Sequence, residues 1–139
     1  MNIKEIQNEI VAEFSMFDDW MERYEYIIEL GKGLPLIAEE YKTEDNIIKG
    51  CQSKVWVHAE EKDGKVFFSS DSDAILTKGI IAILIRAFSN QTPADILAAN
   101  TDFIDEIGLK EHLSATRANG LVSMIKKIKM YALAFEARN

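Results

Sequence analysis

The hydrophobic pattern at the start of the chain has the period of a helix. Apolar residues recur every three or four positions, which places them on one face of an amphipathic helix: Ile3, Ile6, Ile10, Phe14 and Phe17. A second helical segment follows Asp18 or Asp19, either of which can cap it, and we expect Gly31 to end it. The first quarter of the chain is therefore predicted to form a pair of helices.

The period then changes from that of a helix to that of a strand. Over residues 53–60, Val55, Val57 and Ala59 alternate with polar or aromatic neighbours, as in a half-buried strand. Asp63-Gly64 is typical of a hairpin turn and leads into a second strand at residues 66–68. A short apolar stretch at residues 46–49 predicts one more strand. We expect a small antiparallel sheet of three strands.

Helical patterns return after the sheet. A strongly apolar segment at residues 74–88 follows Asp71, Ser72 and Asp73, each of which can cap a helix. Thr92-Pro93 and Ser114 are further helix starts, and Gly108 is a break between them. The last helix carries an apolar stripe: Leu121, Met124, Ile125, Ile128, Leu133 and Phe135. We predict one α/β domain of the α+β type over residues 1–139.

Composition narrows the function classes. The chain has 139 residues, is 47% hydrophobic and contains one cysteine, so it needs no disulfide framework and has no set of thiolates for zinc or an iron-sulfur cluster. Its two histidines, His58 and His112, lack the spacing of a zinc hydrolase. No glycine-rich phosphate loop is present either. We therefore expect no cofactor and no metal site.

Charge and hydropathy constrain the partners. The net charge is -7 and argues against a general nucleic-acid binder. The negative excess lies in residues 1–70, which carry fifteen Asp and Glu against eight Lys and Arg. These acids form either a solvated helix surface or a face that steers a basic partner. The longest apolar run, residues 79–85, is far shorter than the ~20 residues of a membrane span. We expect a cytoplasmic protein with no membrane partner.

The candidate chemistry centres on Cys51. Gly50 permits a tight turn before it, and polar Gln52 and Ser53 follow, so the thiol is expected on a loop between two strands. A reactive thiol must ionise, and its ordinary pKa of about 8.5 leaves a few per cent of thiolate at neutral pH.

Cations could lower that pKa. Lys49 and Lys54 flank the loop, and Arg117 and His112 are further cations that could approach it in space. Two alternatives to a reactive acceptor thiol remain open from the residues. One is an interaction module with a structural or redox-sensing Cys51, which binds through the acidic first helices. The other is a thiol hydrolase or transferase, which would need His112 beside Cys51 and an open pocket.

The motif around Cys51 is similar to that of a known family. Gly50-Cys51-Gln52-Ser53, followed by Val55-Trp56, resembles the signature of the SufE family. Three further blocks occur in the family's order, and they begin at Tyr24, Ser72 and Leu113: Tyr24-Glu25-Tyr26-Ile27-Ile28-Glu29-Leu30-Gly31 with Leu34-Pro35, Ser72-Asp73-Ala74 with Lys78-Gly79, and Leu113-Ser114 with Arg117 and Gly120-Leu121.

The resemblance implies a fold and a function. SufE proteins share with IscU scaffolds an antiparallel sheet packed with helices, and they accept sulfur from a SufS-type, pyridoxal-phosphate-dependent cysteine desulfurase. Cys51 would carry the sulfur as a persulfide toward a downstream scaffold of iron-sulfur cluster assembly. Arg117 would pair with Cys51 or order its loop, and Asp73 would either position that loop or cap a helix. The paralogous CsdE branch shares these blocks, so a CsdA-like desulfurase is the alternative partner.

Overall fold

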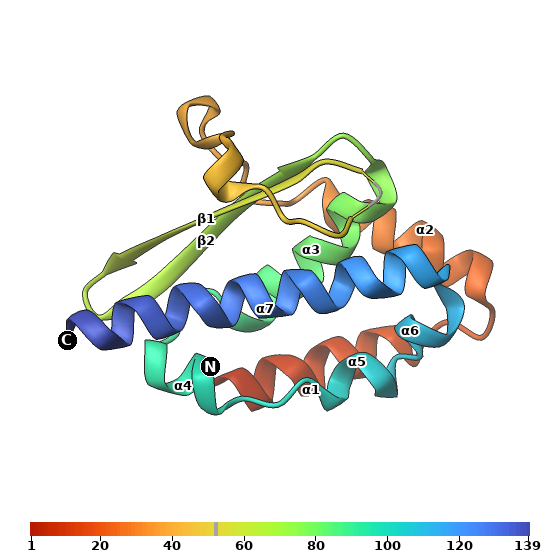
Figure 1. Cartoon of the computed structure of the whole chain (residues 1–139). Helices are drawn as coiled ribbons and strands as arrows, with labels where there is room; N and C mark the ends of the chain where they lie inside the picture. Colours follow the sequence, from red (N-terminus) through yellow and green to blue (C-terminus); the bar gives the residue numbers. More distant parts are fainter. Residues whose placement is uncertain (52) are drawn as a thin grey trace.

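The computed structural model of the protein describes residues 1–51 and 53–139 (Figure 1). It is an α+β fold in which helices pack against a long, twisted hairpin, as the sequence predicts. The helices are α1 (Ile3–Phe14), α2 (Trp20–Gly31), α3 (Ile75–Phe88), α4 (Pro93–Ala98), α5 (Asp102–Glu106), α6 (Leu109–His112) and α7 (Ala115–Arg138). The strands are β1 (Val55–Lys62) and β2 (Lys65–Ser72), and the short 3-10 turns are η1 (Glu39–Tyr41) and η2 (Glu44–Asn46).

The first two helices begin and end close to the predicted residues. The Asp19 side chain accepts a hydrogen bond from the Glu22 N–H and caps α2, which ends at Gly31. Phe17 was predicted on the face of α1, but the helix ends at Phe14. Phe17 lies instead in the turn before α2, where its ring packs 5.0 Å from that of Tyr26.

The sheet differs from its prediction in one strand. β1 and β2 pair antiparallel from Val55 opposite Ser72 to Lys62 opposite Lys65 around the predicted turn. Among the described residues this sheet has two strands, so the expected third strand at residues 46–49 is wrong. Ile47 makes only an isolated bridge to Trp56. The physical reason is that η2 occupies the start of this segment and a left-handed Gly50 follows it, which leaves too little extended chain for a ladder.

Helix α3 is the centre of the core, with nine buried residues. It crosses α2 at Gly79, where a Cβ atom would overlap the Ile27 carbonyl group. The predicted caps are wrong: Ala74 is the N-cap residue and makes no side-chain cap hydrogen bond. The Asp73 carboxylate is turned to Lys54, as described below.

Helix α7 runs along the whole molecule and covers the inner face of the hairpin (Figure 1). Ser114 caps it as predicted. Its buried stripe includes Ile128, Ala132 and Phe135, whereas Leu133, predicted to be part of the stripe, is 59% exposed. Leu133 lies one position beyond Ala132, and this rotates it out of the stripe.

Candidate functional site

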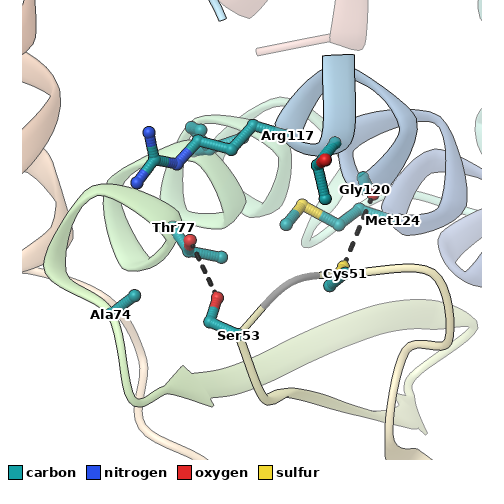
Figure 2. A pocket seen from close by; sticks show the side chains of 9 residues that line it. Cys51, Ser53, Ala74, Thr77, Arg117, Gly120 and Met124 are labelled. Carbon is teal, nitrogen blue, oxygen red and sulfur yellow. Dashed lines mark hydrogen bonds between the residues drawn. The ribbon is translucent and has the colours of Figure 1, made fainter. Parts of the chain in front are cut away.

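Cys51 lies in the loop before β1, pressed against the N-terminal half of α7 (Figure 2). Its thiol donates a long hydrogen bond to the Gly120 carbonyl oxygen, with 3.9 Å between Sγ and oxygen. A Cβ atom at position 120 would lie 3.1 Å from Sγ, so a side chain there would push the sulfur away by a few tenths of an ångström. The turn into the loop uses Gly50 at a φ of 91°, a conformation that favours glycine. A glycine therefore lies on each side of the contact, Gly50 in the cysteine loop and Gly120 in α7.

A cavity of about 150 Å³ opens beside the sulfur. Its polar lining consists of Ser53 from the loop, Thr77 from α3 and Thr116 from α7. The apolar part of the lining consists of Ile80 and Met124. The hydroxyl oxygens of Ser53 and Thr77 are 3.1 Å apart and form a hydrogen bond that joins the loop to α3 (Figure 2). The thiol therefore borders a small, partly polar space that is open to solvent.

Hydrogen bonds to the backbone of Lys54 fix the far end of the loop. The Lys54 N–H donates to Oδ1 of Asp73 at 3.1 Å, and the Asp73 N–H donates back to the Lys54 carbonyl at 3.3 Å. The Ser72 hydroxyl donates to the same carbonyl at 2.7 Å. Asp73 therefore positions the end of the cysteine loop, and this role replaces the helix cap.

The electrostatic environment of the resting thiol opposes ionisation. Cys51 is half-buried, and burial raises the pKa of its thiol because the thiolate would lose hydration. The flanking lysines, Lys49 and Lys54, are both exposed to solvent. In this conformation Cys51 is a neutral thiol at neutral pH. The thiolate that nucleophilic attack needs is therefore disfavoured in this conformation.

The comparisons with known proteins show the family of the chain. The profile of the SufE family, an Fe-S metabolism associated domain, matches residues 8–132. The chain belongs to the SufE family. An uncharacterized SufE-like protein of Rhizobium meliloti is 42% identical over 130 residues, which cover 90% of this chain and 93% of the relative. One from Synechocystis is 39% identical over 127 residues, covering 91% and 80%.

A solved structure shares the SufE-family fold of this chain. The solution structure of a hypothetical protein from Thermus thermophilus superimposes with a TM-score of 0.77 at 19% identity and covers 93% of this chain and 94% of its own. The likeness extends over both the helices and the hairpin. It shows that the arrangement of elements around Cys51 belongs to a known fold.

The structure brings only some of the predicted site residues of this SufE-family chain together. Gly50, Ser53 and Asp73 shape the cysteine loop, and Gln52 lies outside the described residues. Arg117 lines the cavity, but its guanidinium extends along α3 and points away from Cys51 (Figure 2). The sequence does not single out Thr77 or Met124 as site residues, because each fits an ordinary position of an apolar helix face.

His112 belongs to a different part of the molecule. Its ring stacks on that of Trp20 with centroids 3.9 Å apart, and its Nδ1 lies 3.0 Å from the Gly108 carbonyl oxygen. The Tyr24 hydroxyl donates to the His112 carbonyl. Among the described residues, His112 is not part of the Cys51 cavity. The hypothesis of a thiol hydrolase or transferase with a Cys51–His112 pair is therefore wrong.

Metal-ligating clusters and membrane-spanning helices are both absent from the described part of the chain. Within residues 1–51 and 53–139, no three His, Cys, Asp or Glu side chains are grouped so that they could hold a metal ion. None of the helices in these ranges is long and apolar enough to span a bilayer.

Proposed function

We propose that this protein accepts sulfur from a pyridoxal-phosphate-dependent cysteine desulfurase onto Cys51 and relays it for iron-sulfur cluster assembly. The observation that carries the proposal is the position of the one cysteine, at the border of a small cavity in a loop of the SufE-family fold. Membership of a family associated with Fe-S metabolism supports the same role. The partner is a SufS-type or a CsdA-like desulfurase.

The transfer is a thiol exchange that needs no outside oxidant. The Cys51 thiol first loses its proton, and the thiolate attacks the outer sulfur of the desulfurase's cysteine persulfide. A new S–S bond forms on Cys51 while the donor's S–S bond breaks, and the donor cysteine leaves as a thiolate that takes up the proton. Cys51 becomes a persulfide, and the oxidation level of the transferred sulfur moves with it. Pyridoxal phosphate acts only in the partner.

The resting position of Cys51 fits a carrier that is activated on docking. A neutral, half-buried thiol against Gly120 resists oxidation to sulfenic and then sulfinic acid. The same burial slows attack on a persulfide, so the loop must move the sulfur away from α7 when the donor binds. Binding free energy at the partner surface can drive this movement, because only the exposed form can react.

The cysteine count supports a relay in place of cluster assembly. A cluster scaffold needs several thiolate or imidazole ligands, and this chain has one cysteine. A carrier works well with one, since a second nearby thiol would displace the bound sulfur by forming a disulfide. The recipient is therefore a separate scaffold that attacks the outer sulfur of the Cys51 persulfide.

Intact mass measurement tests the proposal. The protein is incubated with L-cysteine and either a SufS-type or a CsdA-like desulfurase, and its mass is recorded with and without reductant. We expect a gain of one or more sulfur atoms that reductant removes, together with faster sulfide release by the desulfurase. Cys51→Ser abolishes both effects, and Ser123→Ala, a change beside the loop that spares the thiol, retains them. Stimulation that survives in Cys51→Ser would overturn the proposal.

A further inference from the structure

The cavity beside Cys51 is accessible to small molecules while the loop rests on α7. The thiol borders the cavity from its position against Gly120, and the cavity is open to solvent. Its volume of about 150 Å³ is half of the roughly 300 Å³ at which pockets for drug-sized ligands begin. A protein partner cannot enter a space of this size, whereas a molecule of a few heavy atoms can.

The cavity carries a positive charge that no carboxylate of its lining opposes. Among the described residues, the lining contains Arg117 and neither Asp nor Glu. Across the ranges 1–51 and 53–139, the Arg117 guanidinium takes part in none of the salt bridges. A guanidinium stays charged and binds a carboxylate through two parallel hydrogen bonds. The cavity therefore favours an anion, and a carboxylate matches the guanidinium in shape.

The charge and the sulfur lie at opposite ends of the cavity. Figure 2 shows the Arg117 guanidinium on the side of Thr77, whereas the sulfur of Cys51 lies on the side of Gly120. A ligand that occupies the cavity lengthwise would place one end beside the guanidinium and the other beside Sγ. The arrangement thus fits a molecule with an anionic group at one end and a group that reacts with sulfur at the other.

The hydroxyl groups of Ser53 and Thr77 add a hydrogen-bond donor to the cavity. Two hydroxyl groups that share one hydrogen bond use one of their two hydrogens. In the part of the chain that the structure describes, neither hydroxyl makes a second hydrogen bond. Thr77 is only 6% exposed, and both residues line the cavity. The second hydrogen is therefore available to an acceptor atom inside the cavity.

We propose that this cavity binds a small thiol carboxylate, which takes the sulfur from the Cys51 persulfide without a protein partner. This inference rests on the proposed function, because the desulfurase loads Cys51. The carboxylate of the ligand binds Arg117, and its thiol meets the outer sulfur of the persulfide. A water molecule takes about 30 Å³ in the liquid, so the cavity of about 150 Å³ has room for the outer sulfur and for a thiol of a few heavy atoms.

The step is a thiol exchange in which atoms and electrons balance. The ligand's thiol loses its proton to solvent, and its thiolate attacks the outer sulfur of the Cys51 persulfide. A new S–S bond joins the ligand to that sulfur, the S–S bond on Cys51 breaks, and Cys51 leaves as a thiolate that takes up a proton. Burial raises the pKa of the Cys51 thiol, which makes Cys51 a slow leaving group. A thiol held in the cavity therefore has an advantage over a thiol free in solution.

The single cysteine permits chemical loading of the protein, independent of any desulfurase. An aromatic disulfide reagent forms a mixed disulfide on Cys51, and sulfide then displaces the aromatic thiolate and leaves the Cys51 persulfide. The loaded protein is mixed with mercaptoacetate or with mercaptoethanol, which has a hydroxymethyl group in place of the carboxylate. The loss of the added sulfur is followed by intact mass at equal thiolate concentrations. Glutathione, a much larger thiol carboxylate, is the control for size.

The variants separate binding in the cavity from general charge. We expect mercaptoacetate to unload Cys51 with saturation, at an efficiency about tenfold above that of mercaptoethanol at low salt. Arg117→Gln should remove this difference by raising the KM for mercaptoacetate, and Arg117→Lys should keep part of it. Lys126→Gln is the matched control, because it removes a charge from an exposed position of α7 outside the cavity lining. Ala74→Leu should narrow the cavity and slow mercaptoacetate, and glutathione should gain no advantage from its carboxylates. Circular dichroism confirms that every variant is folded.

The outcomes separate the two proposals. If mercaptoacetate and mercaptoethanol unload Cys51 equally fast, or if Arg117→Gln keeps their difference, the small-thiol site is wrong and the sulfur-acceptor function stands. Loss of the difference in Lys126→Gln as well would assign it to general charge and would also overturn the site. If a desulfurase at saturating concentration adds no sulfur to Cys51 of the parent protein, the proposed function fails, whereas the chemically loaded protein still decides the small-thiol site.

Discussion

The sulfur of Cys51 lies 3.9 Å from the carbonyl oxygen of Gly120, at a position on α7 where any side chain would reach it. The thiol therefore packs directly on the backbone of α7, the longest helix of the fold, because glycine has no Cβ atom to keep it away. This contact also explains why a glycine, a poor helix former, occurs within α7. The resting position of Cys51 thus depends on how its loop packs on α7.

Replacing Gly120 should displace Cys51. In Gly120→Ala the new Cβ would lie 3.1 Å from Sγ, so the sulfur has to move away from α7 by a few tenths of an ångström. We expect native-state alkylation of Cys51 to accelerate severalfold, while the helix itself gains about 1 kcal/mol from alanine. Gly33→Ala is the control, because its Cβ would meet only the Leu30 carbonyl oxygen at an ordinary 3.7 Å. Equal alkylation rates in the two variants would contradict the contact.

The pH dependence of alkylation should report the burial of Cys51. Its pKa is raised in the folded protein by desolvation, so the midpoint of the alkylation rate should lie at higher pH than in the protein unfolded by urea. The contribution of this group to stability is present below the ordinary thiol pKa and is lost as pH rises through the folded-state value. Cys51→Ser is the control for the stability measurement. A folded-state midpoint below that of the unfolded chain would refute the prediction.

The Ser53–Thr77 hydrogen bond should show as a coupling energy. The two hydroxyl oxygens are 3.1 Å apart, and Thr77 is buried. In a double-mutant cycle with Ser53→Ala and Thr77→Val, urea unfolding should give a coupling of about 0.5–1.5 kcal/mol. Both single variants should also loosen the loop and speed Cys51 alkylation. Strictly additive effects of the two substitutions would mean that the contact contributes nothing to stability.

The crossing of α2 and α3 should not tolerate a side chain at Gly79. A Cβ atom there would overlap the Ile27 carbonyl group, which belongs to the backbone of α2 and cannot rotate away. We expect Gly79→Ala to lower the free energy of unfolding by at least about 3 kcal/mol, the upper part of the usual range for overpacking. Urea unfolding measures the loss, with Gly33→Ala as the matched control. A change below about 1 kcal/mol, allowing for about ±0.5 kcal/mol of error, would show that the helices separate easily.

Local signals in the sequence predict much of this fold. The caps at Asp19, Thr92 and Ser114 place the starts of three helices, because a polar side chain bonds its own backbone within one turn. The alternation of Val55, Val57 and Ala59 identifies the buried face of β1. Each of these features depends on residues that are only a few positions apart, so the local sequence is enough to predict it.

Other features depend on partners that are distant in sequence. Asp73 has the sequence position of a helix cap, yet its carboxylate accepts from Lys54, nineteen residues away. His112 pairs with Trp20 in place of Cys51. The third strand fails because the turn at Gly50 and the packing of Cys51 on α7 set the path of that segment.

The sequence by itself determined the class of fold, the family and the candidate reactive residue, since one cysteine in a distinctive motif leaves a single thiol to consider. Only the tertiary structure decided that this thiol rests half-buried on Gly120 with a raised pKa, and that Ser53, Thr77 and Met124 line the cavity beside it. The reason is physical: burial and electrostatic potential are sums over neighbours in space, and residues 51 and 120 become neighbours only when the chain folds.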